Sequence, residues 1–153
     1  MLTMSGSSAL KLIQNAFRKS VEANTFYRVM NKVNIVDAGG GKLTAEIKVD
    51  ESHINYFKTM HGGLIATMAD TLSTTALQTL NIKSDTDEIK EPQSVSVKLD
   101  ITFLRPIPLD SEIIIKCSTV NRGKTLAYAQ IDFMDKTTGK ILVKGNHLMF
   151  IRK

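Results

Sequence analysis

The middle of the chain combines many apolar residues with very few charges. Between Thr59 and Ile82 the only formally charged residue is Asp70. Apolar residues here recur at intervals of three and four, the spacing of a helix that buries a broad face. The stretch therefore predicts one long helix that begins near His61-Gly62-Gly63 and is apolar and buried on most sides. The residues at this spacing are Leu64, Ile65, Met68, Ala69, Leu72 and Ala76.

Much of the remaining chain alternates apolar with polar residues, which is the period of a half-buried strand. After Ser94, for example, Val95, Val97 and Leu99 alternate with Ser96 and Lys98. Glycine-bearing and polar segments between the runs predict tight turns, and strands joined by tight turns pair antiparallel. The predicted strands are 33–36, 43–49, 95–103, 111–119, 124–133 and 141–151.

The order of these elements predicts the fold class. A helix comes first, then two strands, the long helix and four strands, with a charged loop at 83–92. A six-stranded antiparallel sheet wrapped around the long central helix would bury that helix, which gives an α+β fold. The 153 residues suffice for one domain with a real core, so we expect a single domain over 1–153.

The first 24 residues predict an N-terminal helix, because Leu10, Ile13 and Phe17 fall at helical spacing. The segment is basic, contains serines and has no acidic residue before Glu22. Those features also fit a mitochondrial transit peptide. We favour a short lid helix that packs through its apolar face, and we expect a cytoplasmic or mitochondrial location.

Composition excludes several classes of protein. The net charge of +5 comes from scattered lysines and arginines, without a recognition helix, so we expect no nucleic-acid partner. The central stretch holds too many polar residues for a membrane span. The single cysteine, Cys117, lies in an alternating run and is interpreted as a core residue. No cluster of residues has metal-ligand spacing, so we expect no metal.

Asp70 and the two glycines carry the candidate chemistry. An ionised carboxylate inside an apolar helix is costly unless it is paired or used, and residues 59–82 contain no lysine or arginine to pair with it. Gly62 and Gly63 stand where the helix would begin, so a ligand can approach its free backbone N–H groups closely. That end of a helix favours an oxygen that gains negative charge.

Three blocks of sequence carry a family resemblance over nearly the whole chain. They are 55–70, which contains His61-Gly62-Gly63 and Asp70; 95–106, with Val95-Ser96-Val97; and 123–140, with Gly123-Lys124-Thr125. In this order and spacing the chain resembles the hotdog-fold acyl-CoA thioesterases. The most similar branch contains the phenylacetate-pathway thioesterases and thioesterase superfamily member 2. The resemblance implies a hotdog fold and an enzyme of lipid metabolism that hydrolyses acyl-CoA.

The resemblance also implies roles for five residues. Gly62 would donate its backbone N–H to the thioester carbonyl oxygen, and Asn55 would help polarise the same carbonyl. Asp70 would come from a facing subunit and act as general base or nucleophile, and Ser96 would hold the attacking water. His61 is expected to shape the turn through a hydrogen bond. From the residues alone, Ser96 also fits an ordinary polar strand position, and Asn55 a loop cap.

Binding of coenzyme A follows from the same resemblance. Basic side chains at strand ends suit its phosphate groups, and two apolar residues would line the pantetheine path. Coenzyme A is part of the substrate, so no separate cofactor is expected. The residues implied are Phe103, Leu104, Arg105, Arg122, Gly123, Lys124 and Thr125.

The resemblance further implies a homo-oligomer, a dimer of dimers, because the family pairs its sheets edge to edge and shares active sites between subunits. Two other functions remain open. One is a non-catalytic module that binds or senses acyl-CoA. The other is a dehydratase of hydroxyacyl thioesters, which would need a histidine and a carboxylate as acid and base.

Overall fold

The computed structural model describes residues 6–84, 87–89 and 94–152. The predicted order of helices and strands is confirmed, and short 3₁₀ turns are added to it. The elements are α1 (Gly6–Glu22), η1 (Phe26–Met30), β1 (Asn34–Gly39), β2 (Lys42–Lys48), η2 (Glu51–His53), α2 (Gly62–Gln78), η3 (Thr79–Asn81), β3 (Ser94–Phe103), β4 (Glu112–Arg122), β5 (Leu126–Asp135) and β6 (Ile141–Ile151).

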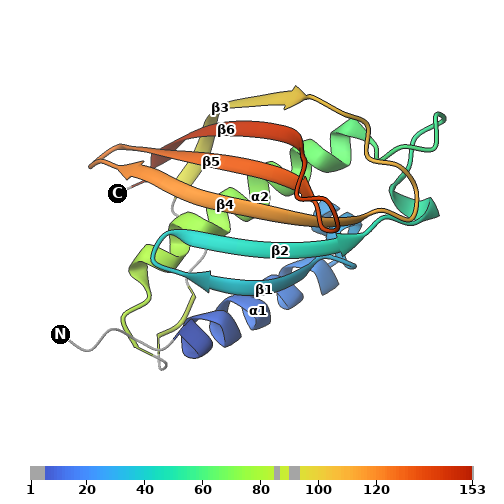
Figure 1. Ribbon diagram of the computed structural model, residues 1–153. Helices are drawn as coiled ribbons and strands as arrows, with labels where there is room; N and C mark the ends of the chain where they lie inside the picture. Colours follow the sequence, from blue (N-terminus) through green and yellow to red (C-terminus); the bar gives the residue numbers. More distant parts are fainter. Residues whose placement is uncertain (1–5, 85–86, 90–93, 153) are drawn as a thin grey trace.

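All six strands form one antiparallel sheet in the order β1-β2-β4-β5-β6-β3. Helix α2 connects β2 to β3 and crosses the concave side of the curved sheet, and α1 lies beside β1 (Figure 1). The connection carries β3 to the far edge, where β6 is its one neighbour in the sheet. The predicted α+β arrangement is confirmed. Strand β3 is left with an open edge.

The inner face of the sheet and one face of α2 form the core. Alternate residues of each strand point inward, so β-branched and aromatic side chains meet the apolar side of the helix. Buried core residues include Ile65, Met68, Ala69, Leu72 and Ala76 on α2 and Leu43, Ala45, Ile113, Ile115, Ile131, Phe133 and Val143 on the strands. Cys117 is also buried here, as predicted, and burial raises the pKa of its thiol.

One face of the central helix is polar. This face of α2 carries polar residues that are half-buried and line a cavity: Asp70, Thr71, Thr74, Thr75 and Gln78. The threonine hydroxyls of Thr74 and Thr75 donate to backbone carbonyls one turn earlier, which lets them sit beside packed helices without unmet donors. The other sides of α2 are buried as predicted, and this face is the exception.

Helix α1 packs on the core, as expected for the segment 1–24. Its residues Ile13, Phe17 and Val21 are buried, and Gln14 Nε2 donates to Ile35 O of β1 at 2.7 Å. Residues 1–5 lie outside the described residues, as do parts of the predicted charged loop 83–92. Within the described ranges, no helix is long and apolar enough to cross a membrane.

Candidate active site

Asp70 and Ser96 lie 26 residues apart in the sequence, and their side chains are in direct contact. Ser96 Oγ of β3 lies 2.5 Å from Asp70 Oδ1 of α2. The contact depends on a β-bulge, because the register of β3 against β6 shifts between Ser96 and Lys98. Ser96 pairs with the buried Met149 and thus faces α2, whereas Lys98 faces outward. The alternation of the sequence puts both opposite Val97 and leaves open which face of β3 lines the cavity.

A buried histidine completes this cluster, and the sequence reasoning missed it. His147 of β6 is fully buried, and its Nε2 lies 2.9 Å from Ser96 Oγ and 3.3 Å from Asp70 Oδ1. Its Nδ1 lies 2.7 Å from Ser73 Oγ of α2. Both ring nitrogens therefore have partners within the protein. The alternation of the sequence could have indicated His147. It lies two residues from both Gly145 and Met149 and shares the inward face of β6 with them.

Burial favours the neutral form of His147. Burial lowers the pKa of His147, and the negative charge of Asp70 opposes this effect in part. In the neutral form with the proton on Nε2, His147 donates to Ser96, and the Ser96 hydroxyl donates to Asp70. Ser73 can then donate to Nδ1, although Ala69 O, 2.7 Å from Ser73 Oγ, competes for the same proton. The hydrogen bonds thus form a chain from His147 through Ser96 to the Asp70 carboxylate.

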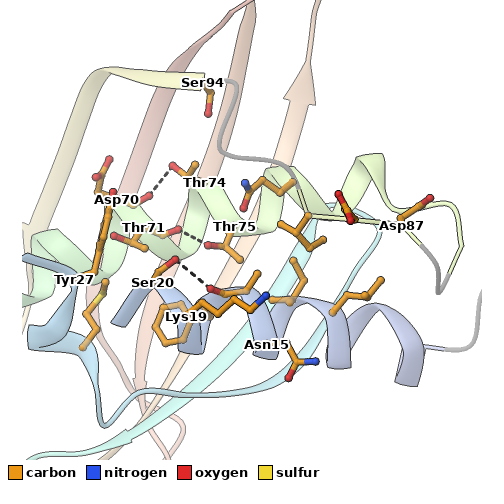
Figure 2. Close-up of a pocket in the computed structure, with 18 of the residues that line it drawn as sticks. Asn15, Lys19, Ser20, Tyr27, Asp70, Thr71, Thr74, Thr75, Asp87 and Ser94 are labelled. Atoms are coloured by element: carbon orange, nitrogen blue, oxygen red, sulfur yellow. Dashed lines mark hydrogen bonds between the residues drawn. The ribbon is translucent and has the colours of Figure 1, made fainter. Parts of the chain in front are cut away.

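Asp70 and Ser96 line a cavity of about 840 Å³, called here the α1–α2 cavity. Figure 2 shows α1 and α2 on opposite sides of it, with Asp70 and Tyr27 drawn toward the same end. The Asp70 side chain remains 41% exposed, so water can reach it. Residues that line the cavity include Ile13, Phe17, Tyr27, Met30, Thr71, Thr74, Thr75 and Ser94.

Gly62 offers a free donor at the beginning of α2. His61 is the N-cap, and its Nδ1 accepts from Gly63 N–H at 2.9 Å. The Gly62 N–H ahead of it has no acceptor among the residues that the structure describes. A side chain on Gly62 would approach the Phe103 ring at 3.3 Å, so Phe103 lies beside this donor. The expected hydrogen bond of His61 in the turn is confirmed.

Asn55 stands in a tight turn before α2. Its Oδ1 accepts from Phe57 N–H at 2.9 Å and from the Thr59 backbone and hydroxyl at 3.3 and 3.2 Å. This is the loop cap that the residue alone allowed. Because the oxygen is held, the amide group has a fixed orientation, and its NH₂ has no acceptor within the described part of the chain. Asn55 can therefore cap the turn and donate to a ligand.

The predicted residues fall into two groups, one near each end of β3. Gly62 and Asp70 lie eight residues apart on α2, a separation of about 12 Å at the helical rise of 1.5 Å per residue. Asp70 therefore cannot attack a carbonyl held at the Gly62 of its own chain. The group near Gly62 contains Asn55, His61, Phe103, Leu104 and Arg105; the group near Asp70 contains Ser96, and Arg122, Gly123, Lys124 and Thr125 follow at the β4–β5 turn.

The candidate residues for coenzyme A are exposed, and they lie near both ends of β3. Arg105 Nη1 donates to Ile141 O at 2.7 Å, which ties the arginine to the start of β6. The β4–β5 turn comes later in the sequence than predicted, since β4 continues to Arg122 and β5 begins at Leu126. It lies near the Ser94 end of β3, because Thr125 O accepts from Ile151 N–H and Ile151 pairs with Ser94.

Known proteins are similar to this chain in sequence and in fold. Residues 57–142 match the family model described as the thioesterase superfamily. Acyl-coenzyme A thioesterase 13 of Homo sapiens is 35% identical over 141 residues, which cover 92% of this chain and 95% of that protein. The chain belongs to the thioesterase superfamily.

Solved structures agree with this assignment. Thioesterase superfamily member 2 of zebrafish has a TM-score of 0.84 and 32% identity, over 93% of this chain and 97% of that one. Thioesterase superfamily member 2 of Mus musculus has a TM-score of 0.81 and 37% identity, over 96% and 98%. The hotdog fold predicted for this thioesterase-superfamily chain is confirmed.

Proposed function

We propose that the protein hydrolyses an acyl-CoA to a free carboxylic acid and coenzyme A. The observation that carries the proposal is the contact of Ser96 and His147 with the water-accessible Asp70, which lines a large cavity. Similar proteins that cover nearly the whole chain are named acyl-coenzyme A thioesterases, which supports the same substrate class.

The site needs two copies of the chain. If β3 pairs antiparallel with β3 of a second copy, the Phe103 end of one strand meets the Ser94 end of the other. Gly62 lies at the first end and Asp70 at the second. Pairing would therefore bring the donors of one copy to the carboxylate of the other. It would also cover the open edge of β3, with its exposed Val97.

The reaction follows from these positions. Gly62 N–H and the Asn55 amide of one copy hold the thioester oxygen and stabilise the negative charge that develops on it. Asp70 of the second copy takes a proton from water as that water adds to the carbonyl carbon. Ser96 fixes the carboxylate and the water, and His147 fixes Ser96. When the C–S bond breaks, the thiolate of coenzyme A leaves and takes up a proton.

Coenzyme A would bind along the same junction. Phe103 and Leu104 are exposed beside Gly62 and would contact pantetheine, and Arg105 would reach phosphate from the same copy. The β4–β5 turn of the second copy, with Arg122, Gly123, Lys124 and Thr125, would supply further phosphate contacts. We propose a dimer of dimers in the cytoplasm or mitochondrion. The steps described require neither a metal nor an organic cofactor.

A hydrolysis screen tests the proposal. Acyl-CoAs of increasing chain length and one aryl-acetyl-CoA are incubated with the purified protein, and a coloured thiol reagent traps released coenzyme A. We expect turnover with at least one substrate class. Tight binding of acyl-CoA without turnover would instead indicate the binding module. A hydroxyacyl-CoA that loses water without release of thiol would indicate the dehydratase.

A further inference from the structure

Two aromatic side chains at the tip of the 55–59 turn are almost fully exposed. Tyr56 is 97% exposed and Phe57 is 80% exposed, and their rings contact each other edge to face with centroids 6.0 Å apart. Neither side chain packs on the body of its own chain. Adjacent large aromatic residues left in water are unfavourable, and they commonly mark a contact surface.

The turn presents these residues rigidly. Asn55 Oδ1 accepts from two backbone N–H groups of the turn, and Lys58 N–H donates to Asn55 O at 3.0 Å. Lys58 has φ +58°, a left-handed conformation that a lysine keeps only where its surroundings hold it. Leu109 N–H donates to Lys58 O and fastens the turn to the β3–β4 connection. The two rings are therefore fixed in position before any partner binds.

The turn lies where a second copy would meet it. It extends beyond the end of β3, at the end of the domain where α2 begins (Figure 1). In the antiparallel β3 pairing that the proposed function requires, this end faces the Ser94 end of the second copy. Asp70, Ser94 and Ser96, which lie at that end of β3, line the α1–α2 cavity of that copy.

We infer that Tyr56 and Phe57 of one copy close the α1–α2 cavity of a second copy and contact the acyl group bound in it. The inference rests on the proposed function. Within one chain the wall of the cavity on α2 is mostly threonine and glutamine, so the aromatic pair would supply apolar surface on the side that is otherwise open. Tyr56 and Phe57 are then specificity-determining residues, and Asn55 of the same turn holds the thioester oxygen next to them.

Kinetics with a double variant test the contact with the acyl group. Tyr56→Ala/Phe57→Ala should change the ratio of kcat/KM for long and short acyl-CoAs by about tenfold or more, since apolar pocket contacts discriminate on this scale. The rate with the shortest substrate should change less. Val120→Ala, which alters an exposed apolar residue of β4, should leave the ratio unchanged. An unaltered ratio in the double variant would overturn the inference.

Mixed assemblies test whether the turn acts on the other copy. Chains with Asp70→Asn and chains with Tyr56→Ala/Phe57→Ala are co-expressed with different tags and purified through both. The working site then combines the intact Asp70 of one chain with the intact turn of the other. We expect the chain-length preference of the wild type. The preference of the double variant would show that the turn acts within its own chain, and would refute the inference.

A cross-link gives a readout that does not depend on turnover. A short bismaleimide should join Phe57→Cys chains to Tyr27→Cys chains in a mixed sample, because Tyr27 lines the same cavity as Asp70 and is partly exposed. Cys117 is buried and should remain unmodified. A wild type without thioesterase activity would reject the proposed function, yet the cross-link would still decide the position of the turn. Failure to cross-link in assemblies confirmed by sedimentation would contradict it.

Discussion

Ser96 Oγ lies 2.5 Å from Asp70 Oδ1 and thereby joins the edge strand of the sheet to the central helix. The same hydroxyl oxygen lies 2.9 Å from His147 Nε2. One serine therefore connects a half-exposed carboxylate, which can meet substrate, to a buried imidazole, which cannot. The geometry assigns Asp70 to the chemistry and His147 to the positioning of Ser96.

Removal of the Ser96 hydroxyl should slow the reaction without unfolding the protein. Ser96→Ala leaves Asp70 without its donor, and we expect kcat to fall by about tenfold to a hundredfold, as for the loss of one hydrogen bond to a charged group. KM should change little. Ser118→Ala, on the outer face of β4, is the matched control. Steady-state kinetics check this, and wild-type kcat in Ser96→Ala would exclude a role for Ser96.

Substitution of His147 should act through Ser96. His147→Leu removes both ring nitrogens, and we expect kcat to decrease by about tenfold, the effect of one hydrogen bond. His147→Gln keeps a donor near Nε2 and should recover part of that loss. Urea unfolding and steady-state kinetics together check this prediction. If both variants were less stable but kept the wild-type kcat, His147 would be only a core residue.

Two variants of Asn55 separate its structural role from its catalytic role. Asn55→Asp keeps the acceptor for the turn but loses the NH₂ donor, so we expect normal stability and a fall in kcat of about a hundredfold, typical of a lost oxyanion donor. Asn55→Ala should lose both, with a decrease of about 1 kcal/mol in the free energy of unfolding. Thermal melts and kinetics measure the two effects. Equal activity of Asn55→Asp and wild type would remove Asn55 from the site.

The two buried histidines predict that stability falls in mild acid. Burial lowers the pKa of His53 and His147 below the usual 6.5. Below about pH 6.5 the unfolded chain binds protons there that the folded chain does not, so the free energy of unfolding decreases as the pH falls from 7 to 5. Urea midpoints across that range test this. His147→Gln should reduce the slope, and a midpoint that rises toward pH 5 would contradict the prediction.

Much of the fold followed from the sequence because its periodicities are regular. Helix α2 lies within one residue of its predicted beginning at His61-Gly62-Gly63, and each predicted strand overlaps a strand of the sheet, with ends that differ by up to three residues. Alternation could not locate the bulge in β3, because an inserted residue changes the face without changing the composition. The pattern alone therefore did not show that Ser96 reaches Asp70.

The candidate site was only partly predictable. The absence of basic residues around Asp70 in the sequence marked it correctly as unusual, whereas its partner His147 lies 77 residues away and meets it only through the pairing of β3 with β6. The sequence did not reveal the polar face of α2, because threonine occurs both in protein cores and in the walls of cavities. The distance between Gly62 and Asp70 along one helix, by contrast, was readable from the spacing alone.

Acyl-CoA hydrolysis by Asp70→Asn tests the central claim most directly. The substitution keeps the shape of the side chain and removes its ability to accept a proton. We expect the variant to fold, to assemble and to bind acyl-CoA, with kcat reduced by about a hundredfold or more, as for the loss of a general base. A folded Asp70→Asn protein that releases coenzyme A as fast as wild type would contradict the assignment of Asp70 to the chemistry.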